Sequence, residues 1–204
     1  GEKYEITFNK ENINIYKLLQ ILSTIINKKM ENIIFFYHLH TTKDTYTNKK
    51  FDIIERHFQE FHLGIIPSHG LLKPQNVPFI PFELTTLTGI NKEMVDNCGD
   101  NIENFNKELT EIFKYCNNPT FITHNINSYD IKIFLNNKCK CIDSKNIIKL
   151  FLNDEISEKS LLEIFFHLFK YKPNIQRSKD NVNMLISVFD KLNITEDKII
   201  NSEI

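Results

Sequence analysis

Two histidines, His38 and His40, occupy the positions of this sequence that could most directly support chemistry. They lie at the end of the apolar stretch "NIIFFYHL" and are followed by the threonine pair Thr41 and Thr42. Residues two apart on a β-strand point to the same side, so both imidazoles are expected on one face of a sheet. An apolar strand that stops at a small polar corner is a common position for paired catalytic carboxylates. Three interpretations are open: a metal site, a degenerate catalytic site, or two ordinary histidines.

The elements that would position these histidines can be predicted from periodicity and from turn residues. Strands are predicted over 32–39, 51–61, 120–124 and 138–144, and 62–90 reads as a further strand followed by a long surface loop. Helices are predicted over 91–97, 100–116 with Asp100 as N-cap, 127–137, 146–153, 157–170 and 178–192. Early strands followed by alternating helices and strands, and then by terminal helices, indicate an α/β domain with a mixed central sheet.

Residues 1–30 are predicted to form an N-terminal amphipathic helical extension, and residues 31–204 the main domain. The extension carries an apolar stripe with a helical period, formed by Ile15, Leu18, Leu19, Leu22, Ile25 and Ile26. The first residue is glycine, so the chain is also expected to be part of a larger polypeptide. The extension is expected to pack on the domain, and a docking helix is the alternative.

The composition limits the classes of function. The 204 residues are 41% hydrophobic and 25% charged with a net charge of −1, so nucleic-acid binding would need a local basic patch. Polar residues at the start and the lack of an apolar run of about 18 residues argue against a signal peptide and a membrane span. Four cysteines without framework spacing suggest reduced thiols and an intracellular location, cytoplasmic or nuclear. Heavy use of Ile, Asn, Lys and Phe is typical of an AT-rich genome.

Four short stretches together resemble one family of nucleases. They are "HLHTT" (38–42), "LTGINKEMV" (87–95), "THNINSYD" (123–130) and "QRSKD" (176–180). The DEDDh 3′–5′ exonucleases of the ribonuclease H-like superfamily have D-x-E-T-T, T-G-I-T-x-E-M-V, H-N-x-x-F-D and H-x-x-x-x-D in this order. The resemblance covers about residues 31 to 192. It implies a ribonuclease H-like, three-layer α/β domain and a role in nucleic-acid metabolism.

The resemblance also implies where the active site of such an enzyme would lie. In the family, four carboxylates hold two divalent cations and a histidine acts as general base. The corresponding positions here are His38, His40, Asp130, Gln176 and Asp180. Thr41, Thr42, Gly89, Ile90, His124 and Asn125 match segments that lie near the nucleic acid in the family. Asp44 and Glu55 are the carboxylates that a shifted alignment would use instead, although Asp44 follows the strand and Glu55 is on another one.

These departures predict that ordinary exonuclease chemistry is lost. Two closely spaced dications require dense negative charge, magnesium prefers oxygen ligands, and the amide of Gln176 cannot accept a proton from water. A catalytically inactive domain, with no cofactor, that acts as a protein-interaction scaffold is therefore expected. One alternative is non-catalytic binding of single-stranded nucleic acid in the old substrate cleft. The other is an unusual metal-dependent exonuclease in which His38, His40, Asp130 and Asp180 bind zinc or manganese.

Overall fold

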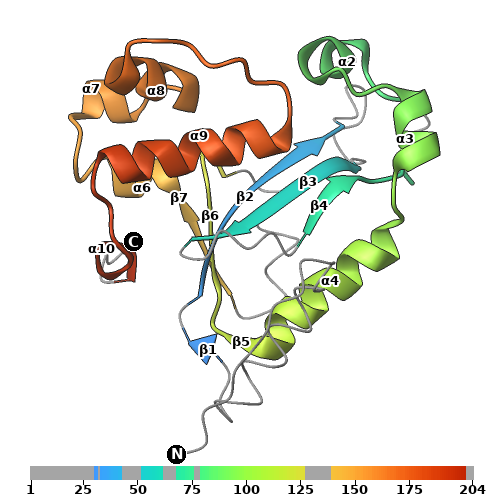
Figure 1. The fold of residues 1–204 in the computed structure, drawn as a ribbon, viewed down its shortest axis with the longest axis horizontal. Helices are drawn as coiled ribbons and strands as arrows, with labels where there is room; N and C mark the ends of the chain where they lie inside the picture. Colours follow the sequence, from blue (N-terminus) through green and yellow to red (C-terminus); the bar gives the residue numbers. More distant parts are fainter. Residues whose placement is uncertain are drawn as a thin grey trace, which may run out of the picture.

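A mixed five-stranded sheet forms the centre of the molecule (Figure 1). The computed structural model of the chain describes residues 30–31, 33–42, 52–61, 68–75, 79–126 and 139–200. The sheet order is β4-β3-β2-β6-β7, and β3 is antiparallel to β2 and β4 while β2, β6 and β7 are parallel. The strands are β2 (Ile34–Thr41), β3 (Ile53–Glu60), β4 (Ser68–Leu71), β6 (Thr120–Thr123) and β7 (Lys140–Asp143). The predicted α/β fold with a mixed sheet is confirmed.

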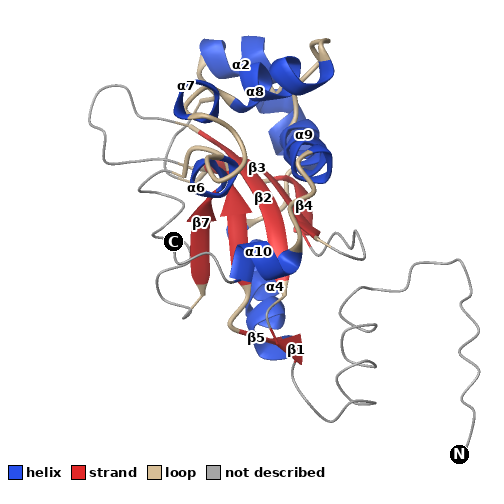
Figure 2. Ribbon diagram, turned by 90° about the vertical axis from the view of Figure 1, so that its left-hand side faces the viewer, coloured by secondary structure: helices blue, strands red, loops and turns tan. Residues whose placement is uncertain are grey.

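Helices cover both faces of the sheet and its two ends. On one face lie α6 (Ser144–Ile148), α8 (Leu161–Phe169) and α9 (Ser178–Lys191), and on the other lies α4 (Ile102–Tyr115). Figure 2 shows α2 (Phe82–Thr88), α7 (Asp154–Ser157) and α8 beyond one end of the strands. Near the other end lie β1 (Met30–Glu31) and β5 (Cys116–Asn117), which pair in parallel. The remaining helices are α3 (Lys92–Cys98) and α10 (Glu196–Ile200).

The alternation of side chains along β2 divides the core into two layers. Ile34 and Phe36 pack with the residues of α6, α8 and α9, whereas Phe35 and Tyr37 pack with those of α4. All four side chains are almost completely buried, which explains why this strand is apolar on both faces. Because the period is two, His38 follows Ile34 and Phe36 onto the α9 side of the sheet.

The segment predicted as a long loop after the third strand contains a helix, so that prediction is wrong for its second half. Helix α2 begins after Pro81, has Glu83 in its first turn and ends at Gly89, which has φ 71° in the left-handed region. Proline before a helix and glycine after it are the residues that favour these two ends. The prolines and glycines of this stretch therefore mark the two ends of a short helix.

Smaller differences concern the ends of helices. The N-cap of α4 is Asn101, whose side chain accepts a hydrogen bond from the Asn104 backbone N–H, and not the predicted Asp100. Asp100 instead accepts hydrogen bonds from Asn101 N and Asn104 Nδ2. Helices α7 and α10 were not predicted; they are only four and five residues long, too short for a periodic signal.

Two predicted helices lie outside the described residues, and one predicted boundary is not tested because the segment before it is not described. These are the helix in the 1–30 extension, the helix over 127–137, and the division of the chain at residue 30. They stay predictions. Among the helices that the structure describes, none has the length and apolar character required to cross a bilayer.

Candidate binding cleft

A cleft of about 470 Å³ lies where the parallel strands β2 and β6 end, between the sheet and helices α2, α8 and α9. The crevice beyond the carboxyl ends of parallel strands is the usual ligand site of open α/β sheets. All four motif segments contribute to its walls. The polar residues that line it are His38, His40, Thr41, Thr123, His124, Asn125, Ser160, Gln176 and Asn181, and the larger apolar ones are Leu84, Leu87, Leu161, Leu162, Ile175, Met184 and Leu185.

The structure brings His38 and His40 together, as the sequence predicts. Their ring centroids are 4.8 Å apart, and the rings meet edge to face. Burial, followed by the charge of the neighbouring His40, lowers the pKa of His38 from its ordinary 6.5 to about 3. A buried imidazole loses hydration when it becomes charged, which is the physical reason for this direction. At neutral pH His38 is therefore an uncharged donor and acceptor.

His40 lies opposite Glu55 of β3 in the antiparallel register. Its Nε2 atom is 3.6 Å from Glu55 Oε2, which is longer than a hydrogen bond, and it is buried without a hydrogen-bond partner. Burial lowers the pKa of His40, and this effect outweighs Glu55 and a hydrogen bond to the Gln176 backbone, which favour the charged form. The contact between the two side chains is thus a close approach and not a formed ion pair.

His124 and Asn125 line the cleft, but their polar groups already serve the loop that follows β6. His124 Nδ1 is 2.9 Å from Ser144 Oγ, and its Nε2 is 3.2 Å from the Lys159 carbonyl oxygen. Burial lowers the pKa of His124, so this ring too is neutral at pH 7. The backbone N–H of Asn125, at φ 60°, donates to the carboxylate of Asp143. Asp143 thus fixes the loop that presents these two residues.

The other predicted nucleic-acid contacts are divided between the cleft and the core. Thr41 lines the cleft, whereas Thr42 is fully buried and pairs with Asp52 through its backbone and its hydroxyl. Gly89 is exposed and Ile90 is fully buried, and neither lines the cleft. Thr42 and Ile90 therefore support the cleft from behind, while Thr41 faces it.

Asp180 does not join the two histidines in this cleft. Its carboxylate accepts hydrogen bonds from the backbone N–H groups of Gln176 and Arg177, at 3.2 and 3.0 Å, and so caps helix α9. It lines a second hollow, of about 400 Å³, beside β3 and β4. The polar residue of α9 that lines the histidine cleft is Asn181, beside the apolar Met184 and Leu185. In the pattern H-x-x-x-x-D four residues separate His and Asp, and counting from Gln176 leads to Asn181. The spacing of this pattern was the signal in the sequence that pointed to Asn181.

The described residues do not fit the pair of divalent ions that the family uses. Among them no three side chains of His, Cys, Asp or Glu lie close enough together to hold a metal ion. The predicted metal ligands that the structure describes are the neutral imidazoles of His38 and His40 and the carboxylate of Asp180, which already caps helix α9. The fourth predicted ligand, Asp130, lies outside the described residues, so the complete set of His38, His40, Asp130 and Asp180 stays a prediction.

Several cleft residues were not predicted from the sequence. Leu84 and Leu87 come from the unforeseen helix α2, and Ser160 and Leu161 come from the start of α8. Ser160 is the N-cap of α8 and forms a capping box with Glu163. The S-x-x-E spacing was visible in the sequence, but its position beside the cleft depends on how α8 packs against β2 and β6.

Comparisons with known proteins agree with this geometry. No family model matches the chain. An uncharacterized exonuclease, R569, of Acanthamoeba polyphaga mimivirus is 28% identical over 153 residues, which cover 70% of this chain and 46% of that protein. The chain thus spans less than half the length of this relative.

Solved structures of 3′-exonucleases share the fold. A 3′-exonuclease from a study of 3′-end-specific recognition of histone mRNA stem-loop has a TM-score of 0.55 at 18% identity, over 90% of this chain and 72% of the other. Escherichia coli exonuclease I with a dA16 oligonucleotide has a TM-score of 0.57 at 15% identity, over 79% and 40%. The dT13 complex also scores 0.57, at 13% identity, over 83% and 42%. The chain therefore has the ribonuclease H-like fold of 3′-exonucleases and resembles the DEDDh family in sequence.

Proposed function

We propose that this chain is a catalytically inactive exonuclease-like domain that acts as a protein-interaction scaffold. The supporting observation is the chemistry of the cleft. The described residues that line it include no Asp, Glu, Lys or Arg, and its three histidines are neutral at neutral pH because burial lowers the pKa values of His38, His40 and His124. A cleft that held two metal ions and a phosphodiester would instead need dense negative charge.

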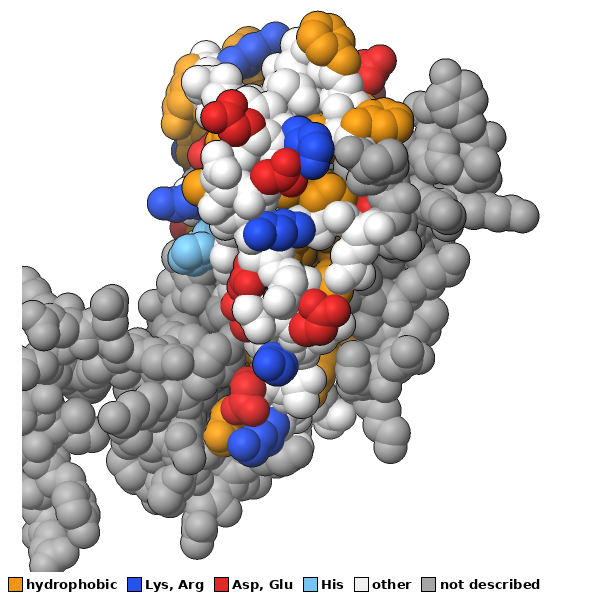
Figure 3. Space-filling model, turned by 90° about the vertical axis from the view of Figure 1, so that its right-hand side faces the viewer, with side chains coloured by type: hydrophobic (Ala, Val, Ile, Leu, Met, Phe, Trp, Pro, Cys, Tyr) orange, Lys and Arg blue, Asp and Glu red, His pale blue; other side chains and the backbone are white. Residues whose placement is uncertain are grey.

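The part of the cleft rim that α2 forms is apolar, which favours a protein partner. Leu87 lines the cleft and is 63% exposed, and Phe82, on the same helix α2, is 80% exposed. Such exposed apolar side chains gathered beside a concave site are typical of protein-binding surfaces. Figure 3 shows the adjacent face over α3 and α4, where acidic and basic side chains are interspersed and form no continuous basic area. This distribution does not favour affinity dominated by phosphate contacts.

The experiment that tests the proposal compares the partners captured by three forms of the protein: the native chain and two variants. Leu87→Arg places a charge on the exposed rim, and Lys92→Glu changes an exposed charge on α3 away from the cleft. Quantitative affinity capture from the source cell is expected to identify a protein that binds the native chain and Lys92→Glu but not Leu87→Arg. Binding that is the same for all three forms would contradict a role for the cleft.

Non-catalytic binding of single-stranded nucleic acid is the second candidate. It is favoured by the position of the cleft at the ends of β2 and β6 and by the oligonucleotides in the exonuclease I complexes. Fluorescence anisotropy with labelled single-stranded DNA and RNA distinguishes the two functions. Leu87→Asp places a negative charge at the position where Leu87→Arg places a positive one. Affinity for nucleic acid that falls steeply with salt and is lost in Leu87→Asp would favour nucleic-acid binding. Absence of measurable affinity at low salt would leave the protein partner as the function.

A further inference from the structure

The buried carboxylate of Glu55 is the central charged group on the α9 side of the sheet. Glu55 is only 5% exposed. Its Oε1 atom accepts a hydrogen bond from Arg177 Nε at 2.6 Å and lies 2.5 Å from Arg177 Nη2. Its Oε2 atom accepts a hydrogen bond from the Ser178 backbone N–H at 2.8 Å. Both oxygens are therefore engaged by groups at the start of α9.

The cation in this arrangement comes from the segment that in the family supplies the general base and the last carboxylate. Arg177 directly follows Gln176, the position that matches the family's histidine. Its guanidinium is permanently charged, and its Nε and Nη2 atoms both lie on one carboxylate oxygen, Glu55 Oε1. Hydrogen bonds between charged groups are stronger than neutral ones. The N-terminus of α9 adds partial positive charge at Ser178, and Ser178 is itself fully buried.

We infer that Arg177 is a resident cation that takes over the role of a metal ion in this site. A buried carboxylate beside the old catalytic strand needs positive charge, and the described residues supply it from within the chain. Oxygen atoms that already accept hydrogen bonds from a guanidinium and a helix N-terminus are poor metal ligands. The site is therefore held together without a divalent ion, which goes beyond the proposal that the domain binds a protein.

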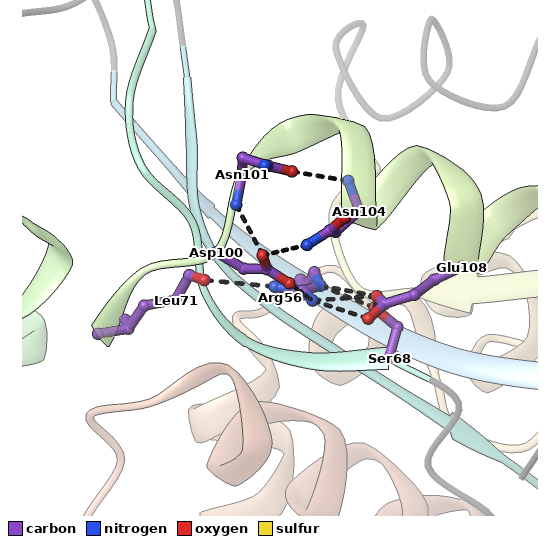
Figure 4. Close-up of polar contacts among 7 residues, drawn as sticks. All are labelled: Arg56, Ser68, Leu71, Asp100, Asn101, Asn104 and Glu108. Atoms are coloured by element: carbon purple, nitrogen blue, oxygen red, sulfur yellow. Dashed lines mark hydrogen bonds and ion pairs between the residues drawn. The ribbon is translucent and has the colours of Figure 1, made fainter. Parts of the chain in front are cut away.

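The opposite face of the sheet offers a matched control. The next residue of β3, Arg56, points to the α4 side, is 2% exposed and binds Glu108 through Nε and Nη2 at 3.0–3.1 Å (Figure 4). Ser68 Oγ and the Leu71 carbonyl complete its hydrogen bonds. This ion pair is also buried and also joins a helix to β3, but it lies away from His38 and His40.

The test measures thermal midpoints of four forms: the native chain, Arg177→Ala, Arg56→Ala and the double variant Glu55→Gln/Arg177→Ala. Each is measured in EDTA and with magnesium, manganese or zinc. The native midpoint is expected to be the same in all four solutions. Arg56→Ala should lower the midpoint by about 10 °C, because it removes one partner of a largely buried pair. Arg177→Ala should lower it by less, because the Arg177 side chain is 37% exposed, although it leaves the buried Glu55 carboxylate without its cation. Glu55→Gln should restore part of the loss in Arg177→Ala, because it removes the uncompensated charge.

The metals distinguish the two arginines. Manganese or zinc should raise the midpoint of Arg177→Ala, where Glu55 and the nearby His40 become available as ligands, but not that of Arg56→Ala or of the double variant. A native midpoint that rises with a divalent ion, or an Arg177→Ala protein that no divalent ion stabilises, would overturn the inference. If Arg177→Ala does not fold, Arg177→Lys retains the charge and should be stable and insensitive to metals. A metal-dependent midpoint in Arg177→Lys would likewise overturn it.

Discussion

At the scale of single residues, the chemistry of this protein depends on imidazoles that are kept neutral. His38, His40 and His57 lie on one face of β2 and β3, with His38 and His57 directly opposite each other in the register. Burial is the largest cause of the lowered pKa of each. Charged groups that face them are Glu55 and Asp180, which favour protonation, and Arg177 and Lys179, which oppose it. The burial cost dominates this balance.

The first prediction is that His38 makes the fold sensitive to acid. Its folded pKa of about 3 is below the ordinary 6.5, so the folded state binds fewer protons than the unfolded state between these values. The stability that neutral His38 contributes to the folded state is fully present above pH 6.5. It is lost as the pH falls toward 3, and the free energy of unfolding decreases by up to about 1.4 kcal/mol per pH unit. Urea unfolding of the native chain and His38→Gln from pH 7.5 to 4.5 measures it. The variant should lose less stability on acidification, and parallel curves for the two proteins would refute the prediction.

The sequence predicted the paired histidines but not the role of the last acidic residue. The strand period alone places His38 and His40 on one face, because that rule is local. The assignment of Asp180 to the cleft depended on helix phase, and a one-residue error turns a side chain by about 100° around a helix. Glu55 was set aside because it is on another strand, yet antiparallel pairing places it opposite His40. Such contacts depend on strand register, which a single sequence does not determine.

At the scale of elements, the turn from α2 to α3 explains a motif that the family places near the nucleic acid. Gly89 has φ 71°, ends α2 with its N–H on the Thr85 carbonyl, and has open space where a Cβ would be added. The glycine of the T-G-I pattern is therefore accounted for by its backbone conformation. Thr88 supports the same turn, since its hydroxyl accepts a hydrogen bond from the Ile90 N–H.

The second prediction follows from this conformation. Gly89→Ala should lower the free energy of unfolding by about 1–2 kcal/mol, the cost of a left-handed conformation for a residue with a Cβ. Gly89→Asn should cost less, because asparagine tolerates this region. Chemical denaturation of the two variants measures the difference. Equal stability of Gly89→Ala and the native chain would show that the turn is not under this constraint.

The third prediction concerns the cap of α8. Ser160 accepts the Glu163 N–H and donates to the Glu163 carboxylate, and it also lines the cleft. Ser160→Ala should lower the free energy of unfolding by about 1 kcal/mol, whereas Ser160→Asp should retain most of the stability because Asp is also a good N-cap. Denaturant midpoints test both. If the free energy of unfolding fell by the same amount in Ser160→Ala and Ser160→Asp, the prediction would be wrong. The Ser160 hydroxyl would then stabilise the fold by contacts in the cleft and not by capping α8.

Most strands and long helices could be predicted because each has a clear period. Strands β2 and β3 and helices α4, α8 and α9 carry long apolar patterns, and the structure confirms them. Helix α2 was missed because its seven residues lie among prolines, which suggested a loop. The walls of the cleft beyond β2 and β6 were also missed, since α2 and α8 reach it through tertiary packing.

At the scale of the whole molecule, an exonuclease fold is combined with a cleft whose described lining is uncharged. The mixed sheet with parallel strands β2, β6 and β7 and a core layer on each face belongs to a fold shared with solved 3′-exonucleases. The family positions that lie in the described residues are His38, His40 and Gln176, and the last carboxylate corresponds to Asp180 in the alignment or to Asn181 by the spacing of the family pattern. The fold thus retains the shape in which the chemistry of the family takes place, with different side chains at its centre.

The fourth prediction is that this shape still accepts the family's residues. A variant with His38→Asp, His40→Glu, Gln176→His and Asn181→Asp should fold and acquire a thermal midpoint that rises with magnesium, because oxygen ligands would now surround the cleft. The control carries only His38→Asp, His40→Glu and Gln176→His, with Asp180 and Asn181 as in the native chain. A response of the same size in the control would show that Asp180, and not position 181, supplies the last ligand.

The most direct test of the central claim is degradation of 5′-labelled single-stranded DNA and RNA with magnesium, manganese or zinc. The purified native chain is compared with Asp130→Ala, which removes one of the carboxylates that the resemblance places in the active site. The account predicts no shortening from the 3′ end above that of Asp130→Ala in any metal. Metal-dependent shortening by the native chain that Asp130→Ala abolishes would contradict it, and would show an active exonuclease with an altered set of ligands.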